Sequence, residues 1–134
     1  MRVTNRHERV ITAVPERITP LIADFGRAWP TELGPAPRPA GDRQYEAGRM
    51  LWEEVDRSGA LRAFRVLKPD ELRLEHWFEV VPAAGGTLLR HIVQGHAVGR
   101  YEAIWRERIG PAHDVILEAL LDNVQAAVSG PGAE

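Results

Sequence analysis

Apolar residues in the last third of the chain recur every three or four positions, which is the spacing of an amphipathic helix. Polar residues occupy the opposite face, which we expect to lie in water. Pro111 follows Gly110 inside this stretch and lacks a backbone N–H, so the pattern predicts a kink or a short break there. A helix of about 27 residues would extend for roughly 40 Å and cross a whole sheet. The apolar face comprises Trp105, Ile109, Ala112, His113, Ile116, Leu117, Leu120, Val124, Ala127 and Val128, and the polar face Arg106, Asp114, Glu118 and Asp122.

The middle of the chain has the alternation and the turn residues that are typical of β-strands. Turn signals at 57–59, 68–70 and 82–86 separate four runs of strand-forming residues. The short turns imply that consecutive strands are antiparallel neighbours. The four runs cover residues 50–55, 61–67, 72–81 and 87–98. Residues 2–13 predict a further strand, in which His7 shares a face with Val3 and Ile11.

A short helix and a long loop separate the first strand from the others. Ile18, Leu21, Ile22 and Phe25 fall on one face of a helix. Pro15 suits the first helical position, whereas Pro20 requires either a kink or a helix that begins with Thr19 as its cap. A second short turn of helix is expected around Ala28-Trp29. Residues 30–41 are rich in Pro and Gly and predict a loop, which either covers a binding site or is a surface excursion without function.

Length and composition indicate one ordinary folded domain that spans residues 1–134, with a frayed end at 129–134. Apolar residues make up 44% and charged residues 27% of the chain, which excludes wholesale disorder. Acidic and basic side chains are interspersed, so no nucleic-acid partner is expected. The chain has no cysteine, which excludes disulfides and thiolate sites. We find neither a signal peptide nor a membrane span and expect a cytoplasmic protein.

The order of elements predicts an α+β fold in which helices lie on one face of an antiparallel sheet. This order resembles the START-like, or SRPBCC, superfamily, whose helix-grip fold wraps a curved antiparallel sheet around a long C-terminal helix, with one or two short helices after the first strand. The resemblance implies a hydrophobic pocket under that helix. Members bind lipids, sterols, plant hormones or polyketides, some cyclise or dehydrate polyketides, and others are co-chaperones. The motifs that carry the resemblance are Ala13-Val14-Pro15-Glu16-Arg17-Ile18, Lys68-Pro69-Asp70-Glu71-Leu72 and Gly85-Gly86-Thr87-Leu88-Leu89.

Strand alternation predicts that two histidines face the helix. The even positions of 72–80 are the more apolar set and include His76, and the odd positions of 87–97 include His91. Pairing Val80 with Thr87 across the turn places these two histidines opposite each other, whereas a slip of two residues pairs His91 with Phe78. Both registers put the two rings on the concave face. His113 lies on the apolar face of the long helix, so three histidines are expected in one interior.

Three interpretations of these histidines stay open. Each ring is a core residue bonded to a protein partner, or a group that orients or exchanges a proton with a ligand, or a metal ligand. No H-x-x-x-H motif is present, and we assign no metal and no cofactor. His76, His91 and His113 are also the candidate catalytic acids or bases. The candidate ligand-binding residues are Trp29, Phe64, His76, Phe78, Leu89, His91, Trp105, His113 and Leu117.

The expected partner is a small hydrophobic or aromatic molecule, held in a cavity between sheet and helix. One alternative is a polyketide cyclase or dehydratase-type enzyme that uses the cavity histidines, and another is a ligand-free interaction module. Trp77 has the parity of the outer sheet face, where an exposed indole would form a partner surface or a homodimer contact. Arg62 shares the parity of Phe64, and facing inward it would need a carboxylate partner or would bind an acid group of a ligand. The alternative is that it lies on a solvated strand face.

Overall fold

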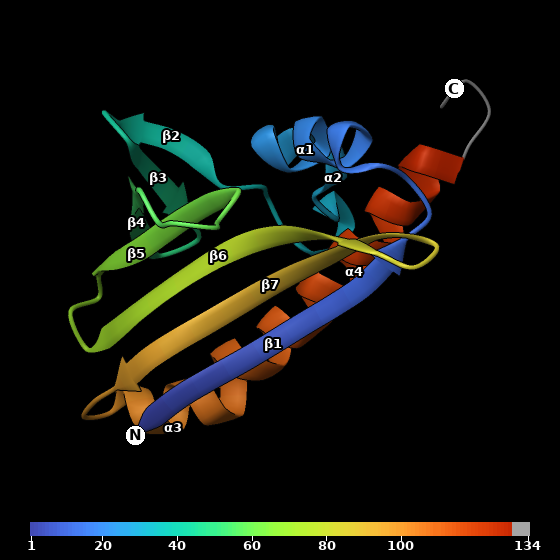
Figure 1. Ribbon diagram of the computed structural model, residues 1–134. Coiled ribbons are helices and arrows are strands. Elements are labelled where there is room, and N and C mark those ends of the chain that lie inside the picture. The colour runs from blue at the N-terminus through green and yellow to red at the C-terminus, as the bar shows by residue number, and fades with distance from the viewer. Residues whose placement is uncertain (130–134) are drawn as a thin grey trace.

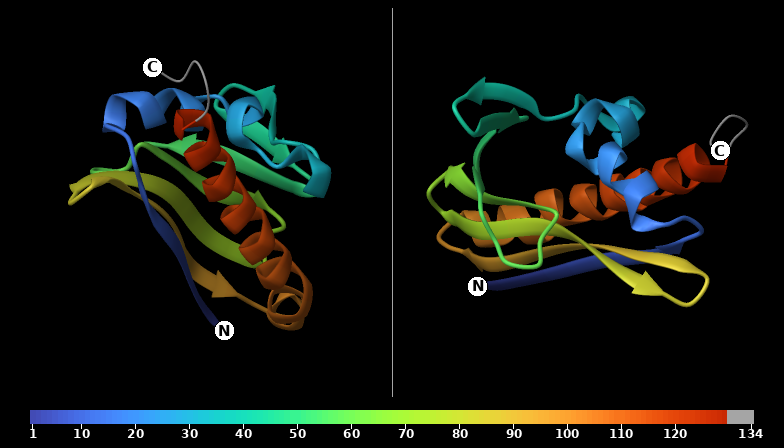
Figure 2. Two further views of the ribbon diagram at one scale, coloured as in Figure 1. Left: turned by 90° about the vertical axis from the view of Figure 1, so that its right-hand side faces the viewer. Right: turned by 45° about the horizontal axis from the view of Figure 1, so that its top comes forward.

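A computed structural model describes residues 1–129 of the chain and contains one antiparallel sheet of seven strands, in the order β1-β7-β6-β5-β4-β3-β2 (Figure 1). The predicted frayed end therefore lies outside the described residues except for Ser129. The sheet curves around a long C-terminal helix, α4, which crosses its concave face (Figure 2). This is the α+β fold that the order of elements predicts, in the helix-grip arrangement that the resemblance implies. The strands are β1 (Arg2–Ile11), β2 (Arg38–Gly41), β3 (Gln44–Ala47), β4 (Met50–Val55), β5 (Arg62–Lys68), β6 (Leu72–Ala83) and β7 (Gly86–Ala97).

The helices follow β1 and β7, as the apolar spacing predicts. After β1 come α1 (Pro15–Ala23), α2 (Phe25–Ala28) and a 3-10 turn at Thr31–Leu33, and after β7 come α3 (Tyr101–Ile104), a π-helical turn at Trp105–Ile109 and α4 (Gly110–Ser129). Helix α1 begins at Pro15 and keeps Pro20 in its interior, so the alternative start at Thr19 is wrong. Thr19 instead donates its hydroxyl to the Pro15 carbonyl at 3.0 Å.

The irregularity expected near Gly110 is a π turn. The Gly110 N–H donates to the Trp105 carbonyl, five residues earlier. A Cβ at position 110 would lie 2.9 Å from that carbonyl oxygen, which explains why a glycine occupies this position. Pro111 follows directly after the π turn, as the second residue of α4.

Strands β2 and β3 lie in a region where apolar and polar residues do not alternate clearly, so the sequence does not predict them. β2 falls within the predicted loop at 30–41, and both strands have only four residues. They extend the sheet beyond β4 and stand away from the long helix (Figure 1). The rest of the predicted loop runs from Trp29 to β2 and includes the 3-10 turn.

The register of β6 and β7 is the slipped one. Phe78 pairs with His91 and Val80 with Leu89, so the alternative with Val80 opposite Thr87 is wrong. The cause is a tight turn: Ala83 pairs with Gly86, and Gly85 adopts a φ of 84°, which leaves two residues in the loop.

Trp77 lies on the outer face by parity, but its side chain is only 3% exposed. The Arg57 guanidinium lies 3.5 Å from the centre of the indole ring, and the indole N–H donates to Glu79 at 2.8 Å. The exposed aromatic surface that would favour a homodimer or an interaction module is therefore absent at this position.

From the sequence we expected the acidic face of the last helix to lie in water. In the structure this face instead contacts the edge strand β1. Asp114 accepts from Asn5 and His7, Glu118 from His7 and Arg9, and Asp122 from Arg9. We call this group of side chains between β1 and α4 the polar seam.

Two apolar clusters hold the helical segment from α3 to α4 against the sheet. One joins α1 and the C-terminal half of α4 to Ile11, Phe78 and Leu89, and the other gathers Val3, Leu72 and Val93 near the N-terminal end of the last helical segment. The space between the two clusters holds the candidate site.

Candidate ligand cavity

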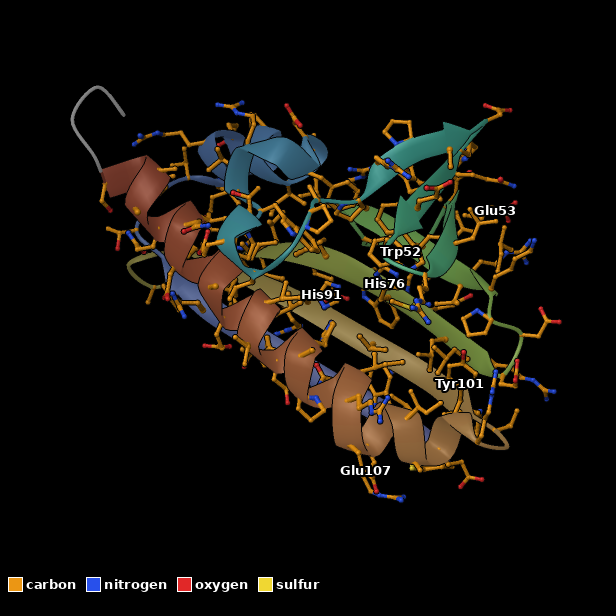
Figure 3. All side chains as sticks on the ribbon, turned by 180° about the vertical axis from the view of Figure 1, so that it is seen from behind. Trp52, Glu53, His76, His91, Tyr101 and Glu107 are labelled. Atoms are coloured by element: carbon orange, nitrogen blue, oxygen red, sulfur yellow. The ribbon has the colours of Figure 1, made fainter. Side chains whose placement is uncertain are left out.

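A cavity of about 420 Å³ lies between the sheet and the last helix, within the size range of small-molecule sites. Strands β4 to β7 form its floor, α4 and the π turn form its roof, and α2 and the loop after it close one side. Figure 3 shows Trp52, His76 and His91 between sheet and helix, whereas Glu53 and Glu107 point away. The lining residues are Phe25, Trp29, Leu33, Gly34, Pro35, Ala47, Gly48, Met50, Trp52, Phe64, Val66, Leu74, His76, Phe78, His91, Val93, Trp105, Arg108, Ile109, Ala112, His113, Ile116, Leu117 and Leu120.

Eight of the nine candidate ligand-binding residues line this cavity. Leu89 does not, because it lies nearer the β6–β7 turn, where it is fully buried in the cluster formed with α1 and α4. These eight residues come from five elements (β5, β6, β7, the π turn and α4) and from the cap of α2. They are Trp29, Phe64, His76, Phe78, His91, Trp105, His113 and Leu117.

Two aromatic residues of the cavity wall, Phe25 and Trp52, are not among the ligand-binding residues predicted from the sequence. The Trp52 ring lies 4.2 Å from His76 and 5.5 Å from Phe64, and Phe25 lies 5.6 Å from Phe64. Alternation in β4 carried the signal for Trp52, because Met50 has the same parity and also lines the cavity.

Arg62 supports this aromatic wall from behind. Its side chain is 10% exposed and forms a bidentate pair with Glu54, at 3.2 and 3.0 Å. The guanidinium also lies 4.4 Å from the centre of the Phe25 ring. Of the alternatives left open for Arg62, the structure shows the inward orientation with a carboxylate partner, and Arg62 is not available to a ligand.

Four histidines form a continuous row from the polar seam into the cavity. The ring centres are 5.9 Å apart from His7 to His113, 5.2 Å from His113 to His91, and 5.6 Å from His91 to His76. The row brings together the three histidines expected from alternation and periodicity, and it adds His7.

The cavity histidines lack hydrogen-bond partners within residues 1–129. His76 Nε2, His91 Nδ1 and His113 Nδ1 are all buried and unpartnered, and so are the indole nitrogens of Trp29 and Trp52. The interpretation of these rings as core residues bonded to a protein partner is therefore wrong at these atoms. Each such atom costs about 1–3 kcal/mol unless a ligand or water pairs with it.

Burial keeps these rings neutral. It lowers the pKa of His76 to about 3 and that of His91 well below its usual value, in both cases helped by the charge of neighbouring histidines. Burial and the charge of His7 lower the pKa of His113 to about 4. Near pH 7 each ring therefore offers one N–H donor and one bare nitrogen as acceptor.

His7 is in the opposite state. Although burial opposes it, hydrogen bonds to Glu118 at 2.6 Å and to Asp114 at 2.8 Å raise the pKa of His7. A ring with both nitrogens bonded to carboxylates carries two protons and a positive charge. His7, His113 and Asp114 also place ligand atoms within 4.8 Å of one another, and the hydrogen bond between His7 and Asp114 accounts for two of these three residues.

No family model and no curated protein sequence matches this chain. Solved structures match its fold over almost the whole length. The KanY protein aligns with a TM-score of 0.67 at 14% identity, covering 97% of this chain and 99% of that one. The Aha1 protein of Colwellia psychrerythraea, described as a dimer, aligns with a TM-score of 0.65 at 13% identity, covering 97% and 99%.

A third neighbour, Ara h 8.0201, aligns with a TM-score of 0.58 at 14% identity and covers 94% of this chain and 99% of that one. At these identities the likeness concerns the fold alone. No helix within residues 1–129 is long and apolar enough to span a membrane. The backbone of the described residues thus has the helix-grip α+β architecture.

Proposed function

We propose that this protein is a binding module that holds a small aromatic molecule in the cavity under α4. The observation that carries the proposal is the set of buried, unpartnered nitrogens on side chains that line an otherwise apolar cavity. A ligand with a few polar atoms would stabilise the folded chain by pairing with these nitrogens while its rings pack on the aromatic wall.

The geometry supports a planar ligand in particular. Rings from Phe25, Trp29, Trp52, Phe64 and Trp105 contribute to the wall, and rigid flat faces favour stacking with an aromatic partner. A binder of aromatic molecules needs no more than this shape and a few polar contacts.

An enzyme of the polyketide cyclase or dehydratase type is less well supported. A general base works best when its pKa is near the working pH, and the pKa values of about 3 for His76 and about 4 for His113 are far below it. Neutral rings of this kind are better suited to donating and accepting hydrogen bonds than to abstracting a proton.

The first test is native mass spectrometry of freshly purified protein, compared with its denatured mass. We expect an extra mass of an organic molecule that is lost on denaturation. If the protein is ligand-free, it should bind the neutral fluorophore N-phenyl-1-naphthylamine, with a rise in fluorescence.

Two variants place this binding in the cavity. Ile116→Trp should fill the cavity and weaken the fluorophore's affinity by about ten-fold. Val115→Trp is the matched control, because Val115 is the preceding residue but is 57% exposed, and it should bind like the parent. Ala112→Trp at the cavity rim repeats the test if Ile116→Trp does not fold. Equal binding by all variants would contradict the proposal.

A further inference from the structure

The cavity lining has an unbalanced charge. Arg108 is the only member of the lining that carries a formal charge near pH 7, and no Asp or Glu of the described residues belongs to it. The Arg108 side chain is exposed and forms no ion pair within residues 1–129. Its guanidinium is therefore free to meet a ligand.

Arg108 lies at the opening of the cavity. The exposed members of the lining mark this opening, and they come from the loop after α2, the β3–β4 turn and the start of the last helical segment. They are Leu33, Pro35, Gly48, Arg108 and Ala112. A ligand whose rings occupy the interior would thus extend its last atoms past Arg108.

The interior is rich in donors. The indoles of Trp29 and Trp52 can only donate, and each neutral imidazole contributes one further N–H. Among the lining side chains, the bare imidazole nitrogens and the weakly accepting Met50 sulfur are the only acceptors. This imbalance calls for a ligand that brings acceptor oxygens.

On the basis of the proposed function, we propose that the ligand is an aromatic acid, whose anionic group pairs with Arg108 at the opening and whose ring system lies in the cavity. Further oxygens on its rings would accept from the indole and imidazole N–H groups. A cationic ligand would meet Arg108 and find no carboxylate in the lining.

A matched pair of fluorophores tests this inference. 8-Anilinonaphthalene-1-sulfonate and N-phenyl-1-naphthylamine share their ring systems and differ by one anionic group. In the parent protein both should bind. Arg108→Gln should weaken the sulfonate by about five-fold and leave the neutral compound unchanged. Added salt should weaken the sulfonate in the parent more than in Arg108→Gln.

Arg106→Gln is the control, because it removes the same charge from the same π turn but from a residue outside the lining. It should leave both affinities unchanged. If Arg108→Gln weakens both compounds equally, or if Arg106→Gln has the same effect as Arg108→Gln, the assignment to an anionic ligand is wrong while the cavity stands. If neither compound binds the parent protein, both the proposed function and the assignment of an anionic ligand are wrong.

Discussion

His7 and His76 lie on the same concave face of the sheet but in opposite electrostatic surroundings. His7, in the polar seam, has a carboxylate on each ring nitrogen and is held in the charged form. His76, at the other end of the row, makes no hydrogen bond or ion pair with a carboxylate within residues 1–129, and burial lowers its pKa to about 3. The comparison teaches that carboxylates, not depth alone, decide the charge of a histidine here. The polar seam that includes His7 stabilises the fold, whereas the cavity histidines have nitrogens without a protein partner within residues 1–129.

The difference between the two histidines should have its largest effect on the free energy of unfolding at acidic pH. Because its folded pKa is below the value of about 6.5 in the unfolded chain, His76 contributes stability that is present above pH 6.5 and is lost as the pH falls toward about 3. At pH 5 this loss is about 2 kcal/mol for such a ring. His76→Phe should reduce the difference in unfolding free energy between pH 7 and pH 5 by that amount, measured by urea denaturation.

Exposed His96 provides the control for this experiment. His96→Gln removes an imidazole that is exposed and lies outside the cavity lining, so a change as large as that of His76→Phe would contradict the role assigned to burial. A difference in His76→Phe equal to that of the parent would show that the His76 ring does not stay neutral in the folded protein.

A smaller effect of the opposite sign is expected from the polar seam. The pKa of His7 is raised in the folded state, so its contribution is fully present below pH 6.5 and is lost as the pH rises through the folded value. His7→Gln should cost about 1 kcal/mol at pH 6 and less at pH 8.5, since the pair is partly exposed. Denaturation midpoints at the two pH values measure this. A cost that grows with pH would contradict the assigned charge.

The smallest effect is a spectroscopic one, measured on the protein without any substitution. Imidazole nitrogen shifts measured by NMR should show His7 protonated on both nitrogens at pH 6, while His76 stays in a single neutral tautomer down to pH 5. Joint titration of the two rings would show that the row behaves as one unit rather than as two environments.

Periodicity was sufficient for the elements that have enough residues to show it. The long helix, the four long runs of strand and the inward direction of His76, His91 and His113 all follow from spacing. β2 and β3 do not, because four residues around Pro and Gly carry no clear alternation.

Other features depend on partners that are far away in the sequence. The burial of Trp77 depends on Arg57, twenty positions earlier, and the polar seam depends on α4 lying beside β1. The register of β6 and β7 depends on the φ angle of Gly85. Leu89 faces the same side of the sheet as the cavity but lies too near the β6–β7 turn to line it. Alternation predicts which face of the sheet a side chain is on, but not how far along the strand the cavity lies.

The π turn adds one residue to the helix and so changes the angle between the side chains before and after it. Eight residues separate Trp105 from His113, and in a regular α-helix this spacing would rotate the two side chains about 80° apart. The extra residue held in the turn reduces that offset to about 20°, and the two rings are in fact 6.3 Å apart over the same cavity. Deleting a single residue between 106 and 109 would produce a straighter helix that points Trp105 elsewhere. In this protein a one-residue insertion that leaves the helix continuous therefore determines where Trp105 points relative to the cavity.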